Sequence, residues 1–156
     1  MLSAQNQPGF PGVKLFSISN DNGYTWTKPE PLCYEDGSYA YSAANFPETF
    51  RSTKNGKPYV IINISPKPCA GCDPRTALHI AELSTDPVAI KRDSVAIIEE
   101  RMPEHHHLVR YSMWKALENR DTGNVLLLMK MAMSEMSPMR NGYDFNCYRY
   151  EIVLPD

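Results

Sequence analysis

Two cysteines, Cys69 and Cys72, form the one C-x-x-C pair in the chain and are the first candidates for metal or redox chemistry. A structural zinc site needs a second pair of ligands at a similar spacing. Cys33 and Cys147 are too dispersed in the sequence to supply that pair. A local disulfide or two free thiols in a loop therefore fit this spacing better than a zinc site does.

Three consecutive histidines, His105, His106 and His107, follow Glu104. Adjacent side chains on an extended segment point to opposite sides, so the three rings cannot easily bind one ion unless a flexible loop brings them together. A polar loop, solvated or facing a substrate, is the simpler interpretation. We therefore predict no metal site and no cofactor.

The segments between these residues have the two-residue periodicity of β-strands. Asn55-Gly56 predicts a tight hairpin turn, because both residues tolerate a positive φ angle. Amphipathic helices are not evident, although Met113–Asn119 could form a turn or two. The clearest strand segments are Val13–Ser19, Pro58–Ser65, Ala77–Ser84, Ser94–Glu99, Asn124–Met133 and Phe145–Leu154. The sequence therefore predicts an all-β fold.

Length and composition restrict the class of protein further. The chain has 156 residues, enough for one domain or a piece of one, and 42% of them are hydrophobic, which predicts folding. A net charge of −2 argues against a nucleic-acid partner. No apolar run is long enough for a membrane span, and the first residues lack the basic and apolar regions of a signal peptide.

The sequence also contains two similar units. Each begins with Tyr-Ser, continues through a turn and reaches an apolar strand. The first unit runs from Tyr41-Ser42 to Tyr59–Ile64, and the second from Tyr111-Ser112 to Val125–Met131. Repetition of one multi-stranded unit is typical of radial repeat folds such as propellers.

One short segment carries a more specific signal, with Ser19, Asp21, Gly23, Thr25 and Trp26 at fixed spacing. Asp21 can accept backbone N–H bonds in its own turn, and Ser19 can add a second such bond. Gly23 can adopt the left-handed conformation, and the Trp26 ring can pack over the corner and anchor it to its blade by burial. An ordinary Asn-Gly hairpin with a nearby tryptophan is the less specific alternative.

This spacing fits S-x-D-x-G-x-T-W, the Asp-box of sialidase-like β-propellers. The chain from Pro11 to Pro155 resembles the C-terminal part of a sialidase-family protein, most clearly in GVKLFSISNDNGYTW, YSAANFPETFRSTKNGKPYVIINI and YDFNCYRYEIVLP. The resemblance implies a partial propeller of about two and a half blades, fewer than a closed ring needs. The implied blade boundaries are 11–34, 41–100 and 108–155.

The resemblance also implies a mechanism. Sialidases are similar to retaining glycosidases but use a tyrosine, paired with a glutamate, as the nucleophile, together with an aspartate as acid and base. Tyr41 in AYS and Tyr111 in RYS match the family's Tyr-Ser pattern, and the local motif favours Tyr41. The alternative for each is a tyrosine that packs inside the fold and hydrogen-bonds through its hydroxyl.

The family also holds the substrate carboxylate with three arginines, whose planar guanidinium groups match a carboxylate. Arg51 and Arg110 are the candidates chosen here, and the other arginines considered are Arg75, Arg140 and Arg149. The first family arginine and the aspartate belong to the first blade, which this sequence does not include. We therefore expect the chain alone not to hydrolyse sialosides.

The function implied by the resemblance is cleavage of a terminal, acidic sugar by a parent glycoside hydrolase. The alternative is an Asp-box propeller that binds carbohydrate without cleaving it, or a structural module. The expected partners are a glycan and either the missing blades or a second copy, because an incomplete ring exposes the faces of its end blades.

Overall fold

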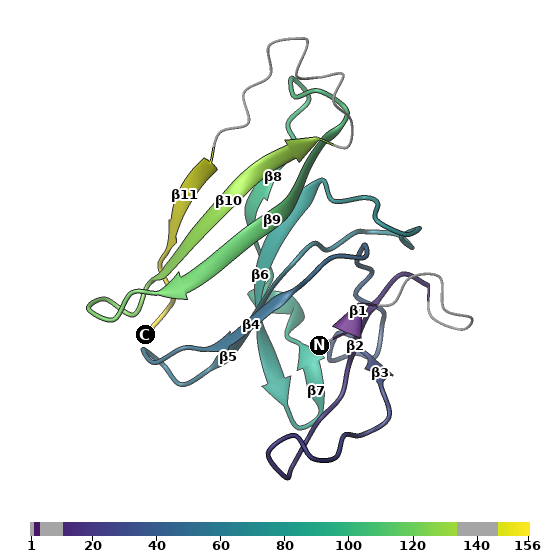
Figure 1. Ribbon diagram of the computed structural model, residues 1–156, viewed down its shortest axis with the longest axis vertical. Coiled ribbons are helices and arrows are strands. Elements are labelled where there is room, and N and C mark those ends of the chain that lie inside the picture. Colours follow the sequence, from purple (N-terminus) through teal and green to yellow (C-terminus); the bar gives the residue numbers. More distant parts are fainter. Residues whose placement is uncertain (1, 4–10, 134–146) are drawn as a thin grey trace.

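The computed structural model describes residues 2–3, 11–133 and 147–156, which form three antiparallel β-sheets, none of them closed (Figure 1). The N-terminal sheet contains β1 (Leu2–Ser3), β2 (Lys14–Phe16) and β3 (Glu30–Pro31). The middle sheet contains β4 (Glu48–Arg51), β5 (Pro58–Ile62), β6 (Ala77–Thr85), β7 (Val88–Ile90) and β8 (Ala96–Glu100). The C-terminal sheet contains β9 (Val109–Glu118), β10 (Val125–Met133) and β11 (Cys147–Ile152). The all-β prediction is confirmed.

The middle sheet is built around β6, which pairs with β5 along one edge and with both β7 and β8 along the other. The β4–β5 hairpin turns at Asn55-Gly56, where Gly56 has a φ of +72°. The predicted hairpin is therefore confirmed. The positive φ of Gly56 explains why a glycine occupies this position, since residues with a Cβ rarely adopt that backbone conformation.

The strand β5 is buried on both faces, because a neighbouring sheet covers each side of the middle sheet. Tyr59 and Ile61 belong to one core with residues of the C-terminal sheet, including Leu127. Val60 and Ile62 belong to a second core, in which Leu32 and Phe16 come from the N-terminal region. A continuous apolar run is what a strand with two covered faces requires.

The C-terminal sheet corrects one expectation from the sequence. Residues Met113–Asn119 do not form a turn of helix; up to Glu118 they belong to β9, which pairs with β10. The register of this pairing shifts once, between Lys130 and Met131 of β10. Tertiary pairing decides the outcome here, because each β9 residue gains a cross-strand neighbour that a short helix could not offer.

Helices contribute little to the described residues. The described residues include one 3-10 turn, Arg92–Ser94. None of their helices is long and apolar enough to cross a membrane.

Candidate functional site

The Asp-box segment forms a closed turn with the hydrogen bonds expected of Ser19 and Asp21. Ser19 Oγ accepts the Gly23 N–H at 2.7 Å and donates to Asp21 Oδ1 at 2.8 Å. Asp21 Oδ1 also accepts the Thr25 N–H at 2.8 Å, and its Oδ2 accepts the Thr25 hydroxyl at 2.6 Å. Gly23 has a φ of +92°. These bonds, that of Thr25 first, lower the pKa of Asp21 to about 2.

The expectation that Trp26 buries its ring against a blade is wrong. The side chain is 63% exposed, and its indole Nε1 donates to the Gly23 carbonyl at 3.0 Å within the turn itself. The tryptophan therefore closes the turn locally and contributes little to the core of the described structure. We expect Trp26→Ala to cost less than about 1 kcal/mol, as surface substitutions usually do.

Asp21→Ala is expected to destabilise the turn more than Trp26→Ala, because it removes both acceptors of Thr25 and the partner of Ser19. The measurement is the urea midpoint of each variant. Since the folded pKa of Asp21 lies below its ordinary value, its contribution to stability is present at neutral pH and is lost as the pH falls toward 2. Equal midpoints for wild type and Asp21→Ala at pH 7 would contradict this role.

Tyr111, one of the two tyrosine candidates, is a core residue. Its side chain is fully buried, and its hydroxyl donates to the Glu100 carbonyl at 3.1 Å. It packs in the core between the middle and C-terminal sheets, beside Tyr59 and Leu127. This is the placement of a tyrosine that packs inside the fold and hydrogen-bonds through its hydroxyl.

Tyr41 occupies a different environment, at the seam between the N-terminal and middle sheets. It is half-buried and forms an isolated antiparallel bridge with Val13, and its carbonyl accepts the Ser65 N–H at 2.9 Å. Its ring lies 6.0 Å from that of Tyr39. Among the described residues no carboxylate hydrogen-bonds the Tyr41 hydroxyl, so the glutamate partner of the family mechanism is not seen.

Beside Tyr41, the segment 43–45 surrounds a buried lysine. Lys14 is fully buried, and its Nζ donates to the Ala43 carbonyl at 2.5 Å and to the carbonyl and side-chain oxygens of Asn45 at 2.9 and 2.6 Å. Burial, and then the nearby Arg75 cation, lower the pKa of Lys14 to about 7. The ammonium thus fixes the main chain that follows Tyr41.

Two asparagines extend this network to the C-terminal sheet. Asn45 Nδ2 donates to Asn63 Oδ1. Asn63 Nδ2 in turn donates to the carbonyls of Ala77 at 2.6 Å and Tyr111 at 3.0 Å. The side chain of Asn63 is buried, so these bonds replace the water that it loses. All three sheets are therefore connected through one polar network.

The loop 69–75 contains Arg75 and contacts Arg110 of β9. Arg75 donates through its Nη2 to the Ala44 carbonyl, and the Ala44 N–H donates to the Gly71 carbonyl at 2.8 Å. Arg110 pairs with Asp73 of the same loop at 2.6 Å. The Oγ of Ser42 and the Nε of Arg75 are buried without a hydrogen-bond partner among the described residues.

The remaining arginine candidates are not brought to this region by any described contact. Arg51 Nη1 donates to the Gly56 carbonyl at 2.6 Å, in its own hairpin. Arg149 lies on β11, paired with Leu128, and Arg140 lies outside the described residues.

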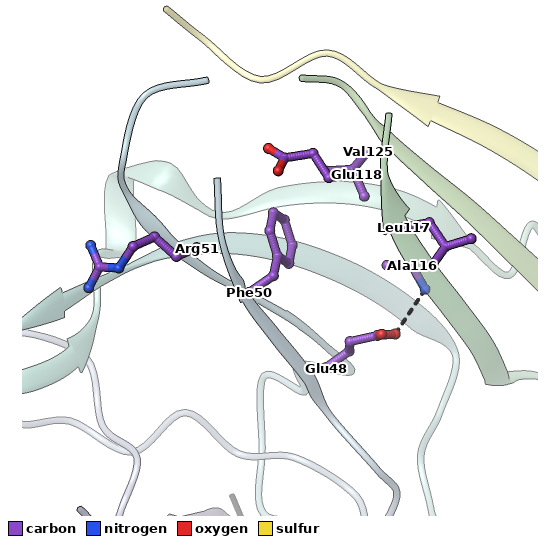
Figure 2. Close-up of a pocket in the computed structure, with 7 residues that line it drawn as sticks. All are labelled: Glu48, Phe50, Arg51, Ala116, Leu117, Glu118 and Val125. Atoms are coloured by element: carbon purple, nitrogen blue, oxygen red, sulfur yellow. Dashed lines mark hydrogen bonds between the residues drawn. The ribbon is translucent and has the colours of Figure 1, made fainter. Parts of the chain in front are cut away.

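A small pocket between β4 and β9 separates two carboxylates (Figure 2). Glu48 accepts the Ala116 N–H at 2.9 Å and the Lys115 ammonium at 2.5 Å. Glu118 accepts the Thr53 N–H at 2.8 Å; burial raises its pKa, but the bonds from Thr53 and Ser52 outweigh this and lower it. The pocket holds about 60 Å³, whereas ligand sites are usually 300–1,000 Å³. The carboxylates therefore connect two sheets and leave no room for a sugar.

The cysteines and histidines show no metal centre in the described part of the chain. Cys69 is buried, whereas Cys72 is exposed. His105 Nδ1 accepts the Met102 N–H and His106 Nδ1 accepts the Leu108 N–H, so both rings cap their own loop. Over residues 11–133 and 147–156, no three His, Cys, Asp or Glu side chains are grouped to hold a metal ion.

Reasoning from the sequence missed Lys14, Asn45 and Asn63. One signal was available: Lys14 and Phe16 share a face of β2, and Phe16 packs in the core, so Lys14 had to point inward as well. The asparagines gave no such signal, because the partners of Asn63 lie in other segments.

No protein-family model, curated protein or solved structure matches this chain.

Proposed function

We propose that this chain is the C-terminal part of a sialidase-like β-propeller whose parent protein acts on a terminal acidic sugar. In this proposal the three sheets correspond to blade segments 11–34, 41–100 and 108–155. The Asp-box turn supports the propeller assignment, because the side chains of Ser19, Asp21 and Thr25 hydrogen-bond within it and Gly23 has a positive φ. Fold alone does not establish chemistry, so the function depends on the region around Tyr41.

The observation that carries the proposal is the arrangement of donors next to Tyr41. Ser42 Oγ and Arg75 Nε are buried without partners in the described structure, and Arg75 is fixed by the Ala44 carbonyl. Arg110, on β9, is held beside the same loop by its ion pair with Asp73. Donors of this kind suit the carboxylate and hydroxyl groups of an acidic sugar.

In the proposed mechanism Tyr41 is the nucleophile and Arg75 and Arg110 hold the carboxylate. The arginine assignment changes with the structure: Arg75 replaces Arg51, whose guanidinium bonds its own hairpin. The acid and base aspartate and the remaining arginine would come from residues that this chain does not contain. Without them the leaving group is not protonated and the substrate is not fully positioned.

Binding can be measured with the 156-residue chain. We expect ligand-observed NMR to detect N-acetylneuraminic acid and not its neutral methyl ester, because only the acid carries a carboxylate. Arg110→Gln should abolish the signal, while Arg149→Gln, on β11, should retain it. Equal signals for acid and ester, or no signal for the acid, would contradict the proposal.

Turnover provides a second measurement. The chain alone is expected not to hydrolyse a fluorogenic sialoside, whereas Tyr41→Phe in a longer active parent should abolish hydrolysis and leave the fold intact. Tyr111→Phe is the matched control and should retain activity, since its hydroxyl is buried in the core. Activity that survives Tyr41→Phe would exclude the tyrosine mechanism.

A non-catalytic sugar-binding propeller is the second candidate. The absence of a carboxylate bonded to the Tyr41 hydroxyl, within the described residues, favours it. Binding of the acid in the NMR experiment, combined with an inactive longer parent, would identify this candidate as the function.

A further inference from the structure

A buried cation lies beside the candidate sugar site. Lys14 is the one lysine or arginine that is fully buried in the described part of the chain, and it shares a face of β2 with the core residue Phe16. Lysine usually keeps its ammonium in water, because a buried charge costs free energy unless other groups bond it. Buried ionisable groups whose pKa is shifted occur preferentially at functional sites. Lys14 is therefore a candidate for a role beyond packing.

The ammonium of Lys14 holds one short segment, residues 43–45. Its Nζ donates to the Ala43 carbonyl at 2.5 Å, to the Asn45 carbonyl at 2.9 Å and to the Asn45 side-chain oxygen at 2.6 Å. An ammonium has three N–H groups, whereas a neutral amine has two and a lone pair. Loss of the proton therefore removes a donor from this segment and replaces it with a lone pair that repels an acceptor oxygen.

The same segment holds Arg75. Ala44 lies between the two residues that Lys14 bonds; its carbonyl accepts from Arg75 Nη2, and its N–H donates to the Gly71 carbonyl at 2.8 Å. Lys14 and Arg75 are also close enough for the Arg75 cation to lower the pKa of Lys14. A change at the Lys14 Nζ thus reaches the Arg75 guanidinium through the main chain of 43–45 and through charge.

We infer that Lys14 is a positioning residue for the candidate sugar site, and that its ammonium form is the form that binds an acidic sugar. The inference rests on the proposed function, in which Arg75 and Arg110 hold the sugar carboxylate. The ammonium fixes the segment that orients Arg75, and it adds a positive charge that attracts the carboxylate. Both effects weaken when Lys14 loses its proton, so the affinity for an acidic sugar should fall as the pH rises.

The groups that surround Lys14 determine the pH range of this change. Arg75 and the thiols of Cys69 and Cys72 interact with it electrostatically, and the flanking strand β3 adds the exposed carboxylate of Glu30. Arg75 remains charged throughout, and burial raises the pKa of Cys69. Burial, and then Arg75, lower the pKa of Lys14 to about 7, so Lys14 changes charge between pH 6 and pH 8.

The first test is the dissociation constant of N-acetylneuraminic acid for the 156-residue chain, by ligand-observed NMR at pH 6 and pH 8. The sugar carboxylate is ionised at both values. We expect binding to be weaker by at least about fivefold at pH 8, as is usual for two coupled sites. The folded chain gains stability through Lys14 over this range, so unfolding cannot cause the loss of affinity.

Two variants assign the pH dependence to one group. Lys14→Met should bind at pH 6 as weakly as wild type does at pH 8, and its affinity should not change between them. Cys72→Ser removes the exposed thiol, keeps Lys14 and should retain the wild-type pH dependence. If Lys14→Met does not fold by circular dichroism, Lys14→Arg, which stays protonated at both pH values, should bind equally tightly at both.

Proton uptake is the second measurement. If the ammonium form binds the acid more tightly, binding must by reciprocity raise the pKa of Lys14, so the complex takes up protons near pH 7. Isothermal titration calorimetry in two buffers with different ionisation enthalpies measures this uptake. We expect it for wild type and for Cys72→Ser, and we expect its loss in Lys14→Met.

The outcomes separate this inference from the proposed function. Equal wild-type affinities at pH 6 and pH 8, or a pH dependence that Lys14→Met retains, would overturn the role of Lys14 and leave the proposed function standing. The four histidines of the chain remain in Lys14→Met, so a dependence that they cause would be retained there. No binding at either pH would overturn both.

Discussion

Replacing Tyr111 with alanine is expected to lower the free energy of unfolding by about 3–5 kcal/mol, the usual cost of removing a buried aromatic ring. Tyr111 is fully buried between the middle and C-terminal sheets, where it packs with Tyr59 and Leu127. Its removal would leave a cavity that both sheets border. Urea denaturation followed by fluorescence measures the loss.

Two variants separate packing from hydrogen bonding at this position. Tyr111→Phe keeps the ring and removes the hydroxyl that donates to the Glu100 carbonyl, so we expect a loss of about 1 kcal/mol. Leu117→Ala, on the exposed face of β9, should change the free energy by no more than about 0.5 kcal/mol. A small effect of Tyr111→Ala would mean that this ring does not hold the two sheets together.

Raising the pH from 7.5 to 9.5 is expected to stabilise the wild-type chain through Lys14 by about 2–3 kcal/mol. Burial, assisted by Arg75, lowers the pKa of Lys14 from 10.5 in the unfolded chain to about 7 in the folded one. Between these values the unfolded chain holds the extra proton, so the free energy of unfolding rises with pH. As the pH falls through this range, that stability is lost.

Lys14→Met isolates this contribution, because methionine has a similar length and no proton to lose. The difference in unfolding free energy between pH 9.5 and 7.5 should be smaller in Lys14→Met by about 2–3 kcal/mol. Lys57→Met, at a partly exposed lysine, should keep the wild-type difference. Parallel pH curves for wild type and Lys14→Met would show that Lys14 does not titrate in this range.

The sequence predicted those parts of the fold that local chemistry determines. The Asp-box turn is closed by residues within a few positions of one another, so their spacing was sufficient. The central residues of the strands β5, β6 and β10 could be recognised from their apolar runs and from turns such as Asn55-Gly56. In each case the partner groups lie nearby in the chain.

The sequence did not predict features that depend on distant segments. Tyr41 and Tyr111 both open a Tyr-Ser pair, yet only Tyr111 is fully buried, because its neighbours in space come from other strands. The acceptors of Lys14 are main-chain and amide oxygens of residues 43 and 45. Every residue has a main-chain carbonyl, so a sequence pattern does not reveal which carbonyls accept from a lysine. For the same reason Arg75 could not be preferred over Arg51.

The two-sided burial of β5 has a consequence for synthesis of the protein. Ribosomes add about 5–20 residues per second, so roughly 3–14 s separate the synthesis of residues 83 and 152. During that interval the nascent chain contains Tyr59, Ile61, Leu78 and Ile80, and the sheet that covers them does not yet exist. Folding of the middle sheet is thus coupled to translation of β9–β11, and a holdase chaperone that binds apolar strands would have its target on this face.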